Sequence, residues 1–219
     1  MFQLIVKDML IQKKTLVFGI FYVAIMIIAM QNSGSATLPA GIMALTYILV
    51  LTACALEDKS KADILLNSLP LGRSSIVMAR YLSVFVYAAL GVIYYVIVSA
   101  IINVFGIPLR TNPITAEGLI GTVFAVSLIV SVYFPAFFKL GYIRSKFINF
   151  ILFFGVFLGI GAISMAFNDK MNSAPISRVK EFLSGLSELQ AAAGLLAISL
   201  LLLSASYLLS VKLYKSREF

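Results

Sequence analysis

YLSVFVYAALGVIYYVIVSAIINVF, residues 81–105, contains no charged side chain. About 20 apolar residues in an α-helix are enough to cross the ~30 Å hydrocarbon layer of a bilayer, so this stretch predicts a transmembrane helix. A strand of a membrane barrel would instead alternate apolar and polar positions over ~10 residues, and this run is apolar on every face. The chain is therefore expected to be an all-α membrane protein.

Five further apolar stretches flank this one, and together they predict a polytopic protein with six transmembrane helices in a single domain, residues 1–219. The composition agrees, since 61% of the residues are hydrophobic and the mean hydropathy is +1.03. A soluble domain has about 45–50% apolar residues and keeps a polar surface. The spans are expected at about 15–31, 38–56, 81–105, 117–138, 147–167 and 191–211.

Lysine and arginine are concentrated on one side of these spans, and short loops rich in these residues stay in the cytoplasm. Thirteen of the 17 lie on that side and four on the other. Both termini and the connection 57–80 are therefore expected in the cytoplasm, and the segment 168–190 outside the cell. The net charge of +8 does not indicate nucleic-acid binding, because the basic residues are spread over several short segments.

Residues 1–14 predict an amphipathic helix that lies on the membrane surface. Its apolar residues recur at helical spacing, at Phe2, Ile5, Val6, Met9 and Leu10. This arrangement turns the polar side chains toward water, namely Gln3, Lys7, Asp8 and Lys14. The alternatives are a cytoplasmic extension of the first span and a secretory signal, for which the apolar run is long.

The expected span interiors contain no ionisable side chain, which argues against a proton-coupled or ion-coupled carrier. The chain has no histidine and one cysteine, Cys54, so neither an internal disulfide, nor a metal site, nor a catalytic residue is expected. It also lacks the glycine-rich phosphate loop that ends in Lys-Ser or Lys-Thr. If the chain takes part in active transport, the energy must come from another subunit.

The cytoplasmic connection EDKSKADILLNSLPLGRSSIVMAR, residues 57–80, predicts a short helix. Ser60 and Asp63 match a capping box in its Ser-x-x-Asp form, and Pro70 ends the helix. The helix is too short to span a membrane, so its apolar ridge is expected to dock in a groove of a partner. Packing on the membrane or under the bundle is the alternative. The ridge consists of Ile64, Leu65, Leu66 and Leu69.

This connection resembles the corresponding segment of type-2 ABC exporter permeases, and in particular of the small six-span, half-size permeases of Gram-positive bacteria. The similar features are the acidic pair at 57–58, the LLNSLP run at 65–70, Arg73 and the Ile-Val step at 76–77. The resemblance implies a coupling helix that binds an ATPase subunit. That role would fall on Asp63, Leu65, Leu66, Leu69 and Pro70, with Glu57 and Arg73 as flanking contacts.

The resemblance also implies the partners. Two permease subunits, identical or different, would assemble with two ATPase subunits in the bacterial plasma membrane. ATP and Mg would bind the ATPase subunits, and this chain would hold no cofactor. The branch includes exporters of antimicrobial or cytolytic peptides, bacteriocin immunity systems and drug efflux systems, which implies a hydrophobic or amphipathic substrate. A membrane anchor or immunity protein that binds a peptide without transporting it is the alternative.

Two further groups of residues in the spans are candidates for packing or transport. Gly155 and Gly159 have the GxxxG spacing that lets helices approach closely, either between subunits or within the chain. Candidates for lining a translocation path are Tyr94, Tyr95, Ser131 and Pro135, for which ordinary packing in the bundle is the alternative.

Overall fold

The computed structural model of the chain describes residues 2–30, 37–60, 72–106, 109, 111, 113–168 and 187–216. Apart from short turns and connections, these residues are helical, and none of them lies in a strand. The all-α prediction is therefore confirmed. The helices are α1 (Phe2–Ile11), α2 (Lys13–Ala29), α3 (Thr37–Lys59), α5 (Arg73–Val104), α6 (Ala116–Asn168) and α8 (Glu188–Lys215).

Within the described part of the chain, four helical segments are long and apolar enough to cross a membrane: 38–59, 73–104, 116–142 and 188–215. The pair α1 and α2, which meets at an angle of 70°, adds a fifth candidate if it is counted as one broken span. The second half of α6 continues to Asn168, and most of its side chains lie outside the described residues. The structure thus supports a multi-span helical membrane protein, and the count of six remains a prediction.

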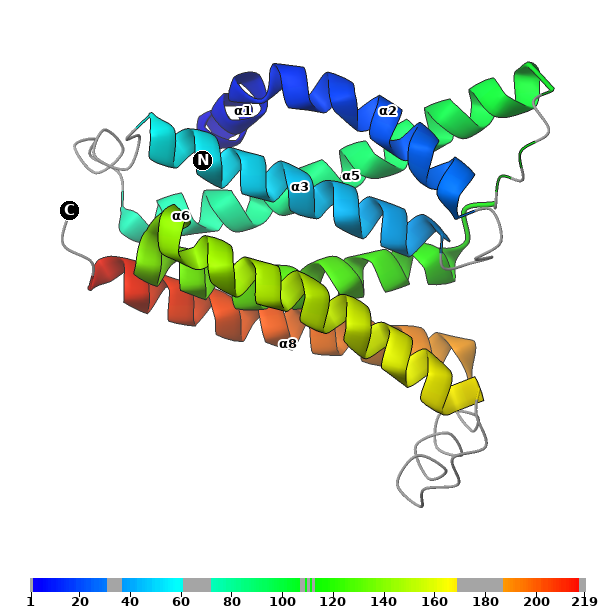
Figure 1. The fold of residues 1–219 in the computed structure, drawn as a ribbon. Helices are drawn as coiled ribbons and strands as arrows, with labels where there is room; N and C mark the ends of the chain where they lie inside the picture. Colours follow the sequence, from blue (N-terminus) through cyan, green and yellow to red (C-terminus); the bar gives the residue numbers. More distant parts are fainter. Residues whose placement is uncertain are drawn as a thin grey trace.

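The helix α6 turns at Gly141, and its two halves run back along the bundle in opposite directions (Figure 1). Gly141 has φ 76° and ψ 176°, a conformation that is essentially restricted to glycine because a Cβ atom would clash there. The expected fourth and fifth spans, 117–138 and 147–167, left a short connection at this point. The structure makes this connection with one non-helical residue.

The bundle is centred on α3, which packs against α2, α5 and the first half of α6, while α8 packs against α5 and α6. Leu49, Val77 and Phe134 are fully buried in this centre. The helices approach closely at Gly91, where a Cβ atom would lie 3.0 Å from Cγ2 of Ile42. Large apolar side chains on the outer surfaces of α2, α5 and α8 are exposed, as expected of helices that face lipid.

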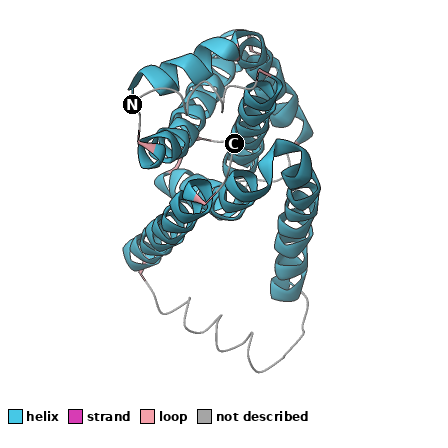
Figure 2. Ribbon diagram, turned by 90° about the vertical axis from the view of Figure 1, so that its left-hand side faces the viewer, coloured by secondary structure: helices cyan, strands magenta, loops and turns pink. Residues whose placement is uncertain are grey.

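One end of the bundle brings together the C-terminal end of α3, the start of α5, the turn at Gly141 and the C-terminal end of α8 (Figure 1). Figure 2, which looks along the bundle, shows that α1 runs across it rather than parallel to the other helices. The contacts of α1 with α3 and α5 hold it at this end. Both ends of the described chain are therefore on the same side of the bundle.

Candidate functional site

The predicted coupling helix falls in the sequence between α3 and α5. Ser60 is the last described residue before it and Gly72 the first after it. Ser60 donates a hydrogen bond from Oγ to the carbonyl of Glu57 (3.1 Å), which closes the last turn of α3. Five predicted site residues lie outside the described residues: Asp63, Leu65, Leu66, Leu69 and Pro70.

Arg73, a predicted flanking contact of the ATPase, binds the end of α8. Its Nη1 donates to the carbonyl of Lys215 at 2.8 Å and to that of Tyr214 at 3.5 Å. The last carbonyls of a helix have no partner within the helix, and a cation there also balances the helix dipole. Arg73 thus ties the start of α5 to the end of α8, next to the segment 61–71.

Glu57, the other predicted flanking contact, points into the bundle and belongs to a buried ion cluster. The guanidinium of Arg80 lies between two carboxylates: Nη1 is 3.0 Å from Oδ2 of Asp8, and Nη2 contacts Oε2 of Glu57. Lys7 places Nζ 3.4 Å from Asp8 Oδ1 and 3.3 Å from Glu57 Oε1. We call these four residues the Arg80 cluster. The cluster is neutral in total, with two positive and two negative side chains.

The Arg80 cluster is nearly closed to solvent. The side chains of Arg80 and Glu57 are each 7% exposed and that of Asp8 is 9% exposed, whereas Lys7 is 32% exposed. Isolated charges would be very unfavourable in such surroundings, and they are tolerated when they are paired and hydrogen-bonded. Each of the three buried side chains therefore depends on the others.

The polar contacts continue beyond the charges along α1 and α5. Ser83 donates from Oγ to Asp8 Oδ2 (3.4 Å), and Gln12 donates from Nε2 to the hydroxyl of Tyr87 (3.0 Å). On α5, the polar residues at 80, 83 and 87 follow the i, i+3, i+7 spacing of one helix face. Asp8 of α1 and Gln12, which lies between α1 and α2, contact this face.

The prediction that Asp8 points to water was wrong, because Asp8 is buried against α5. The other side chains predicted to face water are exposed, as Gln3 and Lys14 are, or partly exposed, as Lys7 is. Arg80, the partner of Asp8, is 72 residues away in the sequence, so no local pattern reveals the contact. The signal that was overlooked is the stripe at 80, 83 and 87 at the start of an otherwise apolar span.

A second buried polar group forms where Pro135 interrupts the hydrogen bonding of α6. Proline has no N–H, so the carbonyl of Ser131, four residues earlier, loses its partner within the helix. Ser206 of α8 replaces that partner and donates from Oγ to this carbonyl at 2.7 Å. Because Ser206 has a single proton, the hydroxyl of Tyr81 must donate to Ser206 (2.6 Å), and Ser210 to Tyr81 (2.9 Å). This chain of hydroxyl groups joins α5, α6 and α8.

We expect Ser206→Ala to lower the free energy of unfolding by about 1–2 kcal/mol, because a carbonyl buried in the membrane loses its partner. Unfolding in mixed detergent micelles measures this change. Ser204→Ala is the matched control on the same helix, since Ser204 is exposed and donates only to the carbonyl of Leu201 in its own helix (3.0 Å). Equal effects of the two substitutions would contradict the assigned role of Ser206.

Comparison with protein families identifies the chain. A family model described as ABC-2 family transporter protein matches residues 3–215, which is nearly the whole chain. The chain belongs to the ABC-2 transporter family. The resemblance noted in the segment 57–80 is thereby confirmed. Searches of curated proteins and of solved structures found no significant match.

The four candidate residues for a path through this ABC-2 permease contact different helices. A Cβ atom at Gly19 of α2 would lie 3.0 Å from Cε2 of Tyr94, so the ring of Tyr94 packs on α2. Tyr95 is buried and lines a small hollow of ≈ 10 Å³ with residues of α2 and α3. Ser131 and Pro135 belong instead to the contact between α6 and α8. Their role in transport remains a prediction.

The glycine pair of the permease lies in the second half of α6. Gly155 is exposed, and a Cβ atom there would have no neighbour within 4 Å among the described residues. The side-chain surroundings of Gly159 lie outside the described part of the chain. No packing against another described helix therefore accounts for Gly155.

Proposed function

We propose that this ABC-2 permease is the membrane subunit of an ATP-driven exporter, powered by a separate ATPase subunit that binds ATP and Mg. The observation that carries the proposal is the family match over residues 3–215. The arrangement of the helices supports it, because the segment 61–71 connects the ends of two helices that pack against each other, α3 and α5. A partner that holds this segment can move both helices.

In this proposal, the ATPase binds the apolar ridge of the segment 61–71 through Leu65, Leu66 and Leu69. Asp63, with Ser60, caps the start of the coupling helix, and Pro70 ends it. Glu57 and Arg73 act at the two ends of the segment, and their contacts support a role in transmitting movement. Glu57 bonds to α5 and α1, and Arg73 bonds to the last turn of α8. Both chain ends and this segment face the cytoplasm of a bacterial cell.

The proposed substrate is hydrophobic or amphipathic, such as an antimicrobial or cytolytic peptide or a drug, and the permease moves it out of the cell. Tyrosine and serine side chains at 94, 95 and 131, which are buried or half-buried, would offer such a substrate a few hydrogen bonds within an apolar path. A second permease copy, identical or different, completes the path. The open space beside Gly155 supports close packing of that copy on the second half of α6.

Co-expression tests this function. With the ATPase encoded next to it, the chain should co-purify as a complex. Inverted membrane vesicles that contain both proteins should take up a fluorescent amphipathic peptide when ATP is added, and vesicles with an ATPase that cannot hydrolyse ATP should not. Equal uptake with and without ATP would refute the exporter and favour the non-transporting anchor or immunity protein.

A further inference from the structure

The helix α1 is attached to the bundle through Asp8 and through Gln12, the residue that follows the helix. Asp8 bonds to Arg80 and Ser83 on α5, and Gln12 bonds to Tyr87 on the same helix. Hydrogen bonds and ion pairs are directional, so they fix the position and rotation of α1 more strictly than apolar contacts with lipid do. This attachment distinguishes α1 from an interfacial helix that is held only by contacts with lipid.

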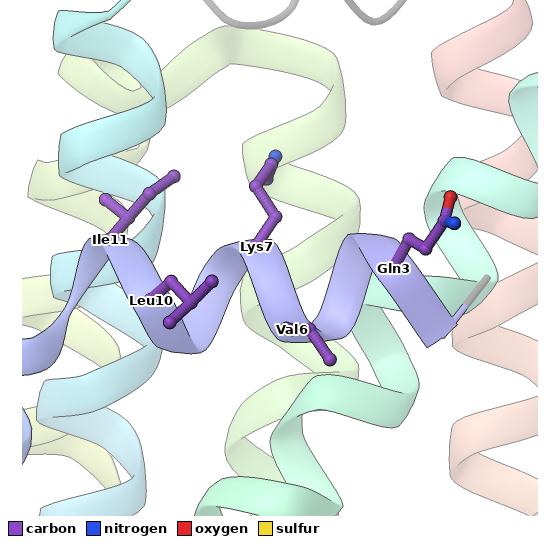
Figure 3. A pocket seen from close by; sticks show the side chains of 5 residues that line it. All are labelled: Gln3, Val6, Lys7, Leu10 and Ile11. Atoms are coloured by element: carbon purple, nitrogen blue, oxygen red, sulfur yellow. The ribbon is translucent and has the colours of Figure 1, made fainter.

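The outward face of α1 is open and carries both apolar and polar side chains. Val6, Leu10 and Ile11, with Gln3 and Lys7, line a shallow hollow of ≈ 510 Å³ on its surface. Figure 3 shows Gln3, Lys7 and Ile11 along one edge of this face and Val6 and Leu10 along the other. The exposed apolar surface continues on α2 at 17, 18 and 21, as expected where both helices border lipid. The outward face of α1 is therefore open, while the Arg80 cluster holds the helix from inside.

The Arg80 cluster joins three helices at one point. Asp8 belongs to α1, Glu57 to the last turn of α3, and Arg80 lies about two turns inside α5. The hollow beside the cluster, lined by Lys7, Asp8, Gln12 and Glu57 among others, measures only ≈ 10 Å³. Such a space holds at most about one water molecule, so solvent screens these ion pairs little.

The two helix ends that the cluster joins are those that flank the segment 61–71, and α1 continues at Gln12 into the corner with α2. We propose that the Arg80 cluster is a positioning device that makes α1 move together with the ends of α3 and α5. A displacement of the segment 61–71 by the ATPase would then reach α2 as well. This inference rests on the proposed function, and Asp8, Glu57 and Arg80 are its positioning residues.

The double variant Lys7→Ala/Asp8→Ala tests whether the Arg80 cluster holds α1 in place. It removes both charges that α1 contributes, and it leaves the pair between Arg80 and Glu57 intact, so the rest of the bundle keeps its contacts. The matched control is Lys14→Ala/Asp58→Ala, which removes one lysine and one aspartate at exposed or half-exposed positions outside the cluster.

The distance between α1 and α3 is the first measurement. Spin labels at Gln3→Cys and Lys59→Cys, both exposed positions, are introduced in a Cys54→Ser background and measured by pulsed electron paramagnetic resonance. The full chain is reconstituted in lipid nanodiscs, with labelled subunits diluted in unlabelled ones. We expect one narrow distance distribution in the parent and in the control, and a broadened or shifted one in Lys7→Ala/Asp8→Ala. An unchanged narrow distribution in that variant would overturn the proposal.

The second measurement is the amount of amphipathic peptide transported per ATP hydrolysed in the complex with the ATPase. We expect the double variant to retain ATP hydrolysis and to lose transport, whereas a purely structural role would reduce both together. A proportional loss of transport and of ATP hydrolysis would also overturn the proposal. So would an unchanged amount of peptide transported per ATP hydrolysed in a variant whose α1 is no longer held in place. Failure of the parent to transport at all would refute the exporter function, and the distance measurement would still test the attachment of α1.

Discussion

Replacing Arg80 with methionine is expected to lower the free energy of unfolding by about 3–5 kcal/mol. The substitution keeps most of the side-chain volume but leaves the carboxylates of Asp8 and Glu57 buried without the guanidinium between them. Lys7 remains near both carboxylates, yet it is partly exposed and provides one ammonium group for two acids. Equilibrium unfolding in mixed detergent micelles measures the loss.

Two further variants separate this mechanism from a general effect of losing a charge. Arg144→Met removes an exposed arginine from α6, and we expect it to change stability by less than about 0.5 kcal/mol. The triple variant Asp8→Asn/Glu57→Gln/Arg80→Met removes the unpaired charges and should recover much of the stability. A triple variant as unstable as Arg80→Met would show that unpaired carboxylates are not the cause.

Replacing Leu66 with aspartate is expected to abolish co-purification of the permease with its ATPase. The change would place an unpaired carboxylate in an apolar groove, where burial without a partner costs several kcal/mol. An effect of this size corresponds to at least about a 100-fold weaker complex. Affinity purification of the ATPase, followed by quantification of the bound permease, measures the loss, and the helical content of the purified permease should be unchanged.

Asn67→Asp is the control for this prediction. It adds the same charge one residue further along with almost no change of shape, and in a helix that begins near residue 61 it faces away from the ridge. The complex should survive this substitution. Equal loss in both variants would mean that charge alone matters, and normal complex formation by Leu66→Asp would refute docking through the ridge.

Composition and apolar periodicity were sufficient to predict an all-α membrane protein, because lipid requires the backbone to satisfy its own hydrogen bonds. They placed a membrane span at 81–105, and the structure gives one helix, Arg73–Val104, that covers nearly all of this span and begins before it. Arg80 lies inside this helix. Helix ends are set by local capping and tertiary contacts, which hydropathy does not register.

The contacts among the polar residues were much harder to predict. The sequence singled out Glu57 and Arg73 by resemblance, but it gave no reason to pair Glu57 with Arg80 or Arg73 with the end of α8. Each contact depends on how helices far apart in the sequence pack together. The interruption at Pro135 was visible in the sequence, whereas the serine on α8 that satisfies the freed carbonyl was not.

The turn at Gly141 limits how the two halves of α6 can rearrange. Only Gly141 joins the two halves, so neither half can slide along the other. Sliding would require a longer connecting loop. The two halves can still change the angle between them. The Gly141 end would then stay fixed, and the largest displacement would occur at the opposite end of the bundle. Access at that far end would then depend on the angle of this hairpin.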